Sequence, residues 1–269
     1  MSETGGSHTN WIPASQYDRY RGSMFSDPYV PDMVERVARL APKRVLETAA
    51  GTGTLARALA STLPDCRIVA TDLNPAMLDQ AAANTSAKTI EWRQADAQAL
   101  PFEAAEFDAV ICQLSVVFFA DKAKAFAEAH RVLTPGGHFI FSVQDRIEEN
   151  EFSALTARAV AKLFPADPPS FLARIPHGYH DVRTIRSSLA RVGFTHVETE
   201  TVTKRSRAGS ARELAIGFCQ GSPLRAEIEA RDASMLQTAT EAAAEAIAAK
   251  FGRGPIDGKM QAHVITAAR

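Results

Sequence analysis

A regular alternation of short apolar runs and amphipathic segments dominates the first half of the chain and most constrains its fold. Five runs predict strands within residues 43–144: KRVLET, CRIVATD, TIEWRQAD, FDAVICQL and HFIFSVQ. Apolar residues at helical spacing fill intervals between them, as in residues 54–63 and 123–133. The alternation predicts an α/β fold with a mostly parallel sheet and helices on both faces.

The regular alternation of strand and helix patterns ends after residue 144, and helical patterns dominate from there. Residues 145–185 and 204–255 predict helical insertions, after strand five and between strands six and seven; HVETETVT between them predicts strand six. Residues 259–269 predict a closing seventh strand, and residues 1–30 an N-terminal cap. We therefore expect one domain over residues 1–269, with its core in residues 43–144 and the insertions forming a lid over the substrate.

Composition excludes several classes of partner. The chain has 30 Lys and Arg residues against 31 Asp and Glu, a net charge of -1, which does not favour a nucleic-acid partner. No apolar run reaches the ~20 residues of a membrane span, and the polar start MSETGGSHTN does not resemble a signal peptide. We expect a cytoplasmic protein. Three scattered cysteines predict neither disulfides nor a metal site.

The loop between the first predicted strand and helix has the composition of a nucleotide-binding turn. Gly51 and Gly53 let the backbone turn sharply and let a ligand approach closely. Glu47 ends strand one, and Asp72 ends strand two, where an acid can accept both hydroxyls of a ribose. These features suit NAD and S-adenosylmethionine equally well.

Further polar residues follow the third and fourth predicted strands. Asp96 and Ala97 end strand three, and Gln113 and Leu114 end strand four. Because the carboxyl ends of parallel strands share one edge of a sheet, these residues converge on one crevice. No Tyr-x-x-x-Lys pair is present to polarise a carbonyl for hydride transfer, which favours S-adenosylmethionine.

Four segments, in this order and spacing, resemble the class I S-adenosylmethionine-dependent methyltransferases: ETAAGTGTLARALA, VATDLNPAMLDQA, ADAQALPFEAAEFDAVICQ and EAHRVLTPGGHFIFS. Within that class, the chain is similar to the type 11 group, which includes enzymes of ubiquinone and menaquinone biosynthesis. The resemblance implies a Rossmann-like, seven-stranded sheet and methyl transfer to a small-molecule acceptor. It departs from the family at Ala49, which occupies the position of the first loop glycine.

The resemblance also implies roles for individual residues. Glu47 would orient the amino group of the methionine moiety, Asp72 would hold the ribose, and Asp96 would read the adenine edge. Gln113 would lie beside the methionine moiety. The full set expected to contact S-adenosylmethionine or its product S-adenosylhomocysteine is Tyr20, Arg21, Glu47, Ala49, Gly51, Thr52, Gly53, Asp72, Leu73, Met77, Asp96, Ala97, Gln113 and Leu114.

The acceptor end is less clear from the sequence. In IPHGYHD, His177 and His180 are candidates for a catalytic base or for binding a polar acceptor, and structural roles are the alternative. Val116, Val117, Phe118 and Phe119 could line an apolar pocket or belong to the core.

Three functional hypotheses remain. The leading one is a methyltransferase acting by in-line displacement, with no metal. The others are an NAD(P)-dependent oxidoreductase and a non-catalytic cofactor-binding scaffold on the same fold. The alanine-rich insertion could pack against its own sheet or a second copy, so a homodimer remains open.

Overall fold

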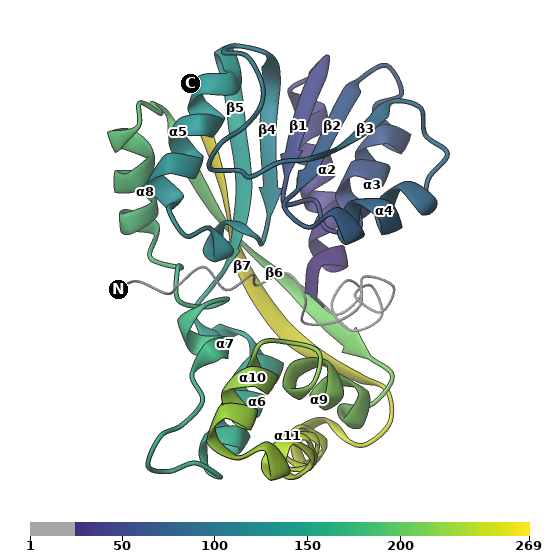
Figure 1. Cartoon of the computed structure of the whole chain (residues 1–269), viewed down its shortest axis with the longest axis vertical. Helices are drawn as coiled ribbons and strands as arrows, with labels where there is room; N and C mark the ends of the chain where they lie inside the picture. Colours follow the sequence, from purple (N-terminus) through teal and green to yellow (C-terminus); the bar gives the residue numbers. More distant parts are fainter. Residues whose placement is uncertain (1–24) are drawn as a thin grey trace.

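A computed structural model describes residues 25–269 and contains a seven-stranded sheet in the order β3-β2-β1-β4-β5-β7-β6 (Figure 1). Only β7 runs antiparallel to its neighbours, β5 and β6. This confirms the expected fold class. The strands are β1 Arg44–Thr48, β2 Arg67–Asp72, β3 Ile90–Gln94, β4 Phe107–Gln113, β5 Leu133–Gln144, β6 Val197–Ala208 and β7 Ile256–Ala268.

Helices cover both faces of the sheet because the central strands are apolar on both sides. On one face α2 (Val30–Arg39) and α3 (Thr54–Thr62) share a core with β1, β2 and β4, and α4 (Pro75–Ala83) contacts β2 and β3. On the other face α5 (Lys122–Val132) and α8 (Val182–Arg191) pack around Phe139 and Phe141. The side chains of Asn74, Asp121 and Asp181 cap α4, α5 and α8.

A second group of helices gathers beyond one end of the sheet (Figure 1). Its members are α6 Glu151–Ala161, α7 Phe171–Arg174, α9 Ala211–Cys219, α10 Leu224–Asp232 and α11 Leu236–Phe251. They share an apolar core that includes the buried Cys219. Short 3-10 turns connect the elements: η2 Asp27–Tyr29, η3 Val116–Phe118, η4 Ile147–Glu149 and η5 Ala233–Met235.

Strands β6 and β7 continue past the sheet as a two-stranded arm that reaches this helical group (Figure 1). The predicted boundary at residue 204 therefore falls inside β6, and the one at residue 259 falls inside β7. The sequence interpretation missed the extension because its alternating residues are largely charged. Arg205 and Arg207 pair across the arm with Asp257, which satisfies those charges.

Two other boundaries differ from the prediction. Strand β5 begins at Leu133, five residues before the predicted run HFIFSVQ, and so includes TPGG; a register shift against β4 accommodates these residues. The boundary at residue 185 cuts α8, whose Ile185 and Leu189 pack on the sheet. The first insertion therefore ends before α8.

Candidate cofactor and acceptor site

The loop between β1 and α3 is held open by three residues in the left-handed conformation. Ala49, Gly51 and Gly53 have φ of 53°, 57° and 79°. A Cβ on Gly51 would meet no atom of the described residues within 4 Å, whereas one on Gly53 would lie 2.3 Å from the Trp92 ring. Packing therefore requires glycine at position 53, and the open space at Gly51 leaves the backbone accessible to a ligand.

Glu47 lies at the end of β1, directly before this loop, and is 3% exposed. Burial raises the pKa of its carboxyl to about 8, and the nearby Asp72 carboxylate adds to the shift. Its Oε2 is buried and has no hydrogen-bond partner among the described residues. A buried carboxylate oxygen without a partner is costly, and a cationic ammonium group would compensate it.

Asp72 at the end of β2 orders the loop. One carboxylate oxygen accepts a hydrogen bond from the Gly51 N–H at 2.8 Å, and the other accepts one from the Asn74 N–H at 2.9 Å. Burial raises its pKa. The next residue, Leu73, is 54% exposed although it is a large apolar side chain, and Met77 on α4 is half-buried. Both can offer apolar surface to a ligand at this strand end.

The ends of β3 and β4 supply the remaining predicted residues. Asp96 is half-buried and accepts a hydrogen bond from the Gln98 N–H at 2.8 Å, which orders the turn containing Ala97. Gln113 donates its amide to the Ser26 carbonyl at 2.9 Å, while its Oε1 is buried and has no partner among residues 25–269. Leu114 has φ of 55° and ends the strand.

The structure thus places most predicted cofactor residues at one edge of the sheet. The remaining member of the loop, Thr52, is buried. Tyr20 and Arg21 lie outside the described residues. In the part of the chain that is described, no group of three or more His, Cys, Asp or Glu side chains could hold a metal ion. No helix there is long and apolar enough to cross a membrane.

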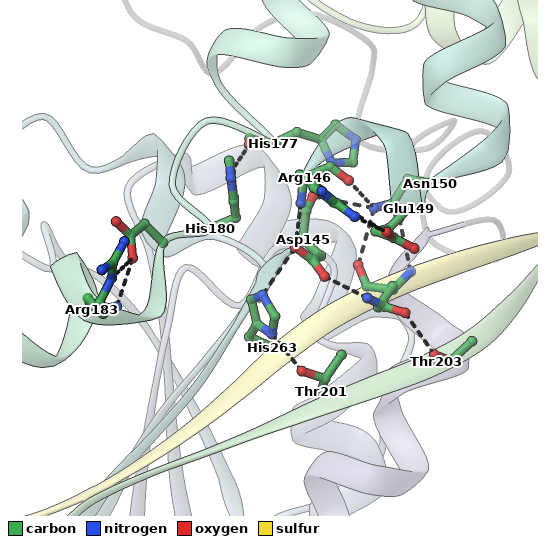
Figure 2. A network of polar contacts seen from close by, with 12 residues as sticks. Asp145, Arg146, Glu149, Asn150, His177, His180, Arg183, Thr201, Thr203 and His263 are labelled. Carbon is green, nitrogen blue, oxygen red and sulfur yellow. Dashed lines mark hydrogen bonds and ion pairs between the residues drawn. The ribbon is translucent and has the colours of Figure 1, made fainter.

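A polar network centred on Asp145 lies beyond the end of β5 (Figure 2). Its carboxylate contacts His263 Nε2 at 3.1 Å and accepts a hydrogen bond from the Gln261 amide at 2.6 Å. His263 Nδ1 lies 3.0 Å from the Thr201 hydroxyl. Sequence reasoning missed this network because its members come from three strands far apart in the chain.

Both predicted histidines adjoin this network. His177 Nδ1 lies 2.8 Å from the Asp145 carbonyl oxygen, and His180 Nδ1 lies 2.7 Å from the His177 carbonyl oxygen. His177 is 2% exposed, and burial lowers its pKa to about 4. The structure therefore brings the histidines to the same edge of the sheet as Glu47 and Asp72.

Comparison with known proteins now identifies the family. The family described as "Methyltransferase domain" matches residues 46–141. A malonyl-[acyl-carrier protein] O-methyltransferase of Geobacter sulfurreducens is 33% identical over 190 residues, covering 66% of this chain and 69% of that protein. The chain belongs to the class I S-adenosylmethionine-dependent methyltransferases, in the type 11 group.

Two further comparisons extend this result to other members. A demethylmenaquinone methyltransferase of Deinococcus radiodurans is 44% identical over 101 residues, which is 37% of this chain and only 42% of that protein. A structure of Haemonchus contortus phosphoethanolamine N-methyltransferase 2, in complex with phosphomonomethylethanolamine and S-adenosylhomocysteine, has a TM-score of 0.55 at 17% identity. That match covers 95% of this chain and 57% of the other, and it supports the shared fold.

The family supplies a cofactor against which the site can be tested, and the residues fit it. S-adenosylmethionine carries an ammonium group, ribose hydroxyls and an adenine ring. Considering residues 25–269, Glu47 offers a buried carboxylate oxygen without a partner, Gly51 an open backbone, and Leu73 exposed apolar surface. Family membership favours the methyltransferase hypothesis over the oxidoreductase.

Proposed function

We propose that this chain binds S-adenosylmethionine at residues 47–53 and transfers its methyl group to a small-molecule acceptor by in-line displacement. The observation that carries the proposal is the buried Glu47 carboxylate beside the open glycine loop. Its Oε2, which has no partner in the described part of the chain, and its raised pKa match a site that receives an ammonium group. Neither feature has a use in a purely structural strand-to-helix turn.

The other strand ends would hold the rest of the cofactor. Asp72 would bind the ribose hydroxyls, Leu73 and Met77 would pack near the adenine, and Asp96 with the following Ala97 would bind the adenine edge. Gln113, whose Oε1 lacks a partner among the described residues, would lie beside the methionine moiety. When bound, S-adenosylmethionine supplies a methyl group that its sulfonium already activates, so the protein chiefly positions the acceptor and excludes water.

The acceptor would bind between the sheet edge and the helical insertions. Phe118 belongs to the packing of both the sheet core and the helical core, so it lies at their junction. The names of the relatives describe acceptors as different as demethylmenaquinone and a carrier-bound malonyl group, which supports a variable acceptor side. The cytoplasmic location and the homodimer remain predictions.

Titration calorimetry with S-adenosylhomocysteine tests the proposal, with NAD and NADP titrated in parallel. We expect micromolar binding of S-adenosylhomocysteine alone, weakened roughly tenfold or more in Asp72→Ala. Glu91→Ala is a matched control, because it removes an exposed carboxylate near the start of β3, away from the carboxyl ends of the strands. Binding of NAD or NADP instead would refute the proposal, and binding of none of the three would favour a scaffold.

A further inference from the structure

His177 contains a buried hydrogen-bonding atom that has no partner among the residues the structure describes. The residue lies between α7 and α8, and its ring rests beside Asp145 (Figure 2). Its Nδ1 faces the Asp145 carbonyl oxygen at 2.8 Å, while its Nε2 is buried and has no partner among residues 25–269. A buried polar atom left without a partner costs about 1–3 kcal/mol, so it needs an explanation.

The contact with Asp145 fixes which nitrogen carries the proton. A carbonyl oxygen can only accept, so Nδ1 must be the protonated nitrogen and Nε2 must carry the lone pair. Burial lowers the pKa of His177 to about 4, and the nearby His180 adds to this shift; Asp145 and Glu148 act in the opposite direction and are outweighed. The ring is therefore neutral near pH 7, and Nε2 can only accept a hydrogen bond.

The position of His177 in the fold relates its Nε2 to the candidate cofactor residues. Asp145 directly follows β5, so His177 is attached to the edge of the sheet at which β1, β2 and β4 also end. Tyr29 packs against Leu114 at the end of β4, and the Asp145 carboxylate contributes to raising the pKa of its hydroxyl. That hydroxyl is also buried without a partner among the described residues. The Asp145 carboxylate therefore acts electrostatically on a second buried polar atom that has no partner among the described residues.

We propose that His177 Nε2 accepts a hydrogen bond from the methyl acceptor, so that the acceptor carries an O–H or N–H group at this position. This inference rests on the proposed methyltransferase function and narrows its substrate class to alcohols, phenols, enols and amines. A carboxylate or an ether has no hydrogen to donate. It would leave Nε2 without a hydrogen bond, or place one of its own oxygen lone pairs against the lone pair of Nε2.

His180 is not the acceptor-binding histidine. Its Nδ1 contacts the His177 carbonyl oxygen, and none of its atoms is a buried atom lacking a partner. Its contact orders the backbone at His177. The sequence offered the two histidines as equivalent candidates. In this proposal His177 binds the acceptor, and His180 supports the loop that carries His177.

Nitrogen-15 NMR of the histidine side chains tests the hydrogen bond directly. The uniformly labelled full chain, saturated with S-adenosylhomocysteine, is titrated with phenol or with anisole, which differ only in that a methyl group replaces the donated hydrogen. We expect phenol to shift the Nε2 resonance of His177 in the direction of a hydrogen-bonded lone pair, and anisole to leave it unchanged. Equal shifts with both probes, or no shift with either, overturn the proposal.

Substitutions separate binding through Nε2 from a structural role. His177→Asn keeps a donor near the Nδ1 position for the Asp145 carbonyl and removes Nε2, whereas His177→Gln can place an oxygen near the Nε2 position. We expect phenol affinity to fall roughly tenfold in His177→Asn and to be partly restored in His177→Gln. His196→Asn is the matched control, because it replaces an exposed histidine just before β6, and it should retain phenol binding; equal losses in all three variants would contradict the proposal.

The affinity for S-adenosylhomocysteine distinguishes the two levels of the argument. Wild type that binds S-adenosylhomocysteine but does not discriminate phenol from anisole refutes the role of His177 and leaves the proposed function standing. Wild type that does not bind S-adenosylhomocysteine refutes the proposed function itself. Unchanged S-adenosylhomocysteine affinity in His177→Asn shows that this variant is folded.

Discussion

Cofactor binding should release a proton from Glu47. The pKa of this carboxyl is about 8 in the free protein, so at pH 7 about nine-tenths of the molecules hold the proton. A bound ammonium group favours the charged carboxylate, so the proton must leave when the ligand binds. Removing it at pH 7 costs about 1.4 kcal/mol, which weakens the apparent affinity roughly tenfold relative to a pH well above 8.

The sign of the pH dependence follows from the direction of the shift. The free protein holds the proton below pH 8 and the complex does not, so affinity rises with pH up to about 8 and then levels off. Calorimetry with S-adenosylhomocysteine measures this release when it is repeated at pH 7 in two buffers with different ionisation enthalpies. The difference in observed enthalpy gives the number of protons released, which we expect to be about 0.9 per ligand.

Glu47→Gln is the matched variant, because its side chain has the same shape and cannot titrate in this range. It should abolish the release and weaken binding by about 1.5–3 kcal/mol, because a charged hydrogen bond is lost. Release that persists in Glu47→Gln would show that another group titrates. Absence of release in wild type at pH 7, with tight binding, would refute the assignment of Glu47 to the ammonium group.

Three further predictions concern the strained loop and the buried histidine. Ala49→Gly should raise the free energy of unfolding by up to about 1 kcal/mol, because the left-handed backbone at this position is strained for alanine and not for glycine. Urea unfolding measures this free energy, and a lower value in the variant would contradict the reasoning. Gly53→Ala should cost about 1–3 kcal/mol more than Gly51→Ala in the same assay, because only the former drives a Cβ into Trp92; equal costs would mean that the ring moves aside. Burial lowers the pKa of His177 to about 4, so protonation of this side chain favours the unfolded state. The free energy of unfolding of the wild type should therefore fall by about 2 kcal/mol relative to that of His177→Asn between about pH 7.5 and pH 5. Equal pH dependence of the two free energies would refute the lowered pKa.

The meeting of the candidate cofactor residues at one edge of the sheet was predictable because it follows from local features. Glu47, Asp72 and Gln113 each end a strand of a parallel sheet, and the topology of such a sheet brings strand ends together without further information. Position 49 shows the limit of motif reading. The family pattern has glycine at this position, which fits a left-handed backbone. The backbone of this chain is left-handed there, although the residue is alanine.

The acceptor half could not be predicted in the same way. Asp145 and His263 are 118 positions apart, and they meet only because β7 inserts antiparallel between β5 and β6. The sequence offered His177 as a candidate base or acceptor-binding residue. Its burial and the direction of each ring nitrogen depend on its tertiary contact with the Asp145 carbonyl oxygen. The β6–β7 arm was missed for a related reason, since its charges are neutralised across strands by Asp257.

The division between these halves also determines what the relatives can say about the acceptor. The matched family region, residues 46–141, contains Glu47, Asp72 and Gln113 but ends before Asp145, His177 and both helical insertions. Similarity over that region supports a shared cofactor and carries no information on the side chains facing the acceptor. The similarity to the Geobacter sulfurreducens protein covers 66% of this chain, so it extends beyond this region, at 33% identity. On the proposal above, the buried lone pair of His177 is the most specific constraint on the acceptor, because it would require a hydrogen that a quinol, an alcohol or an amine can donate and that a carboxylate cannot.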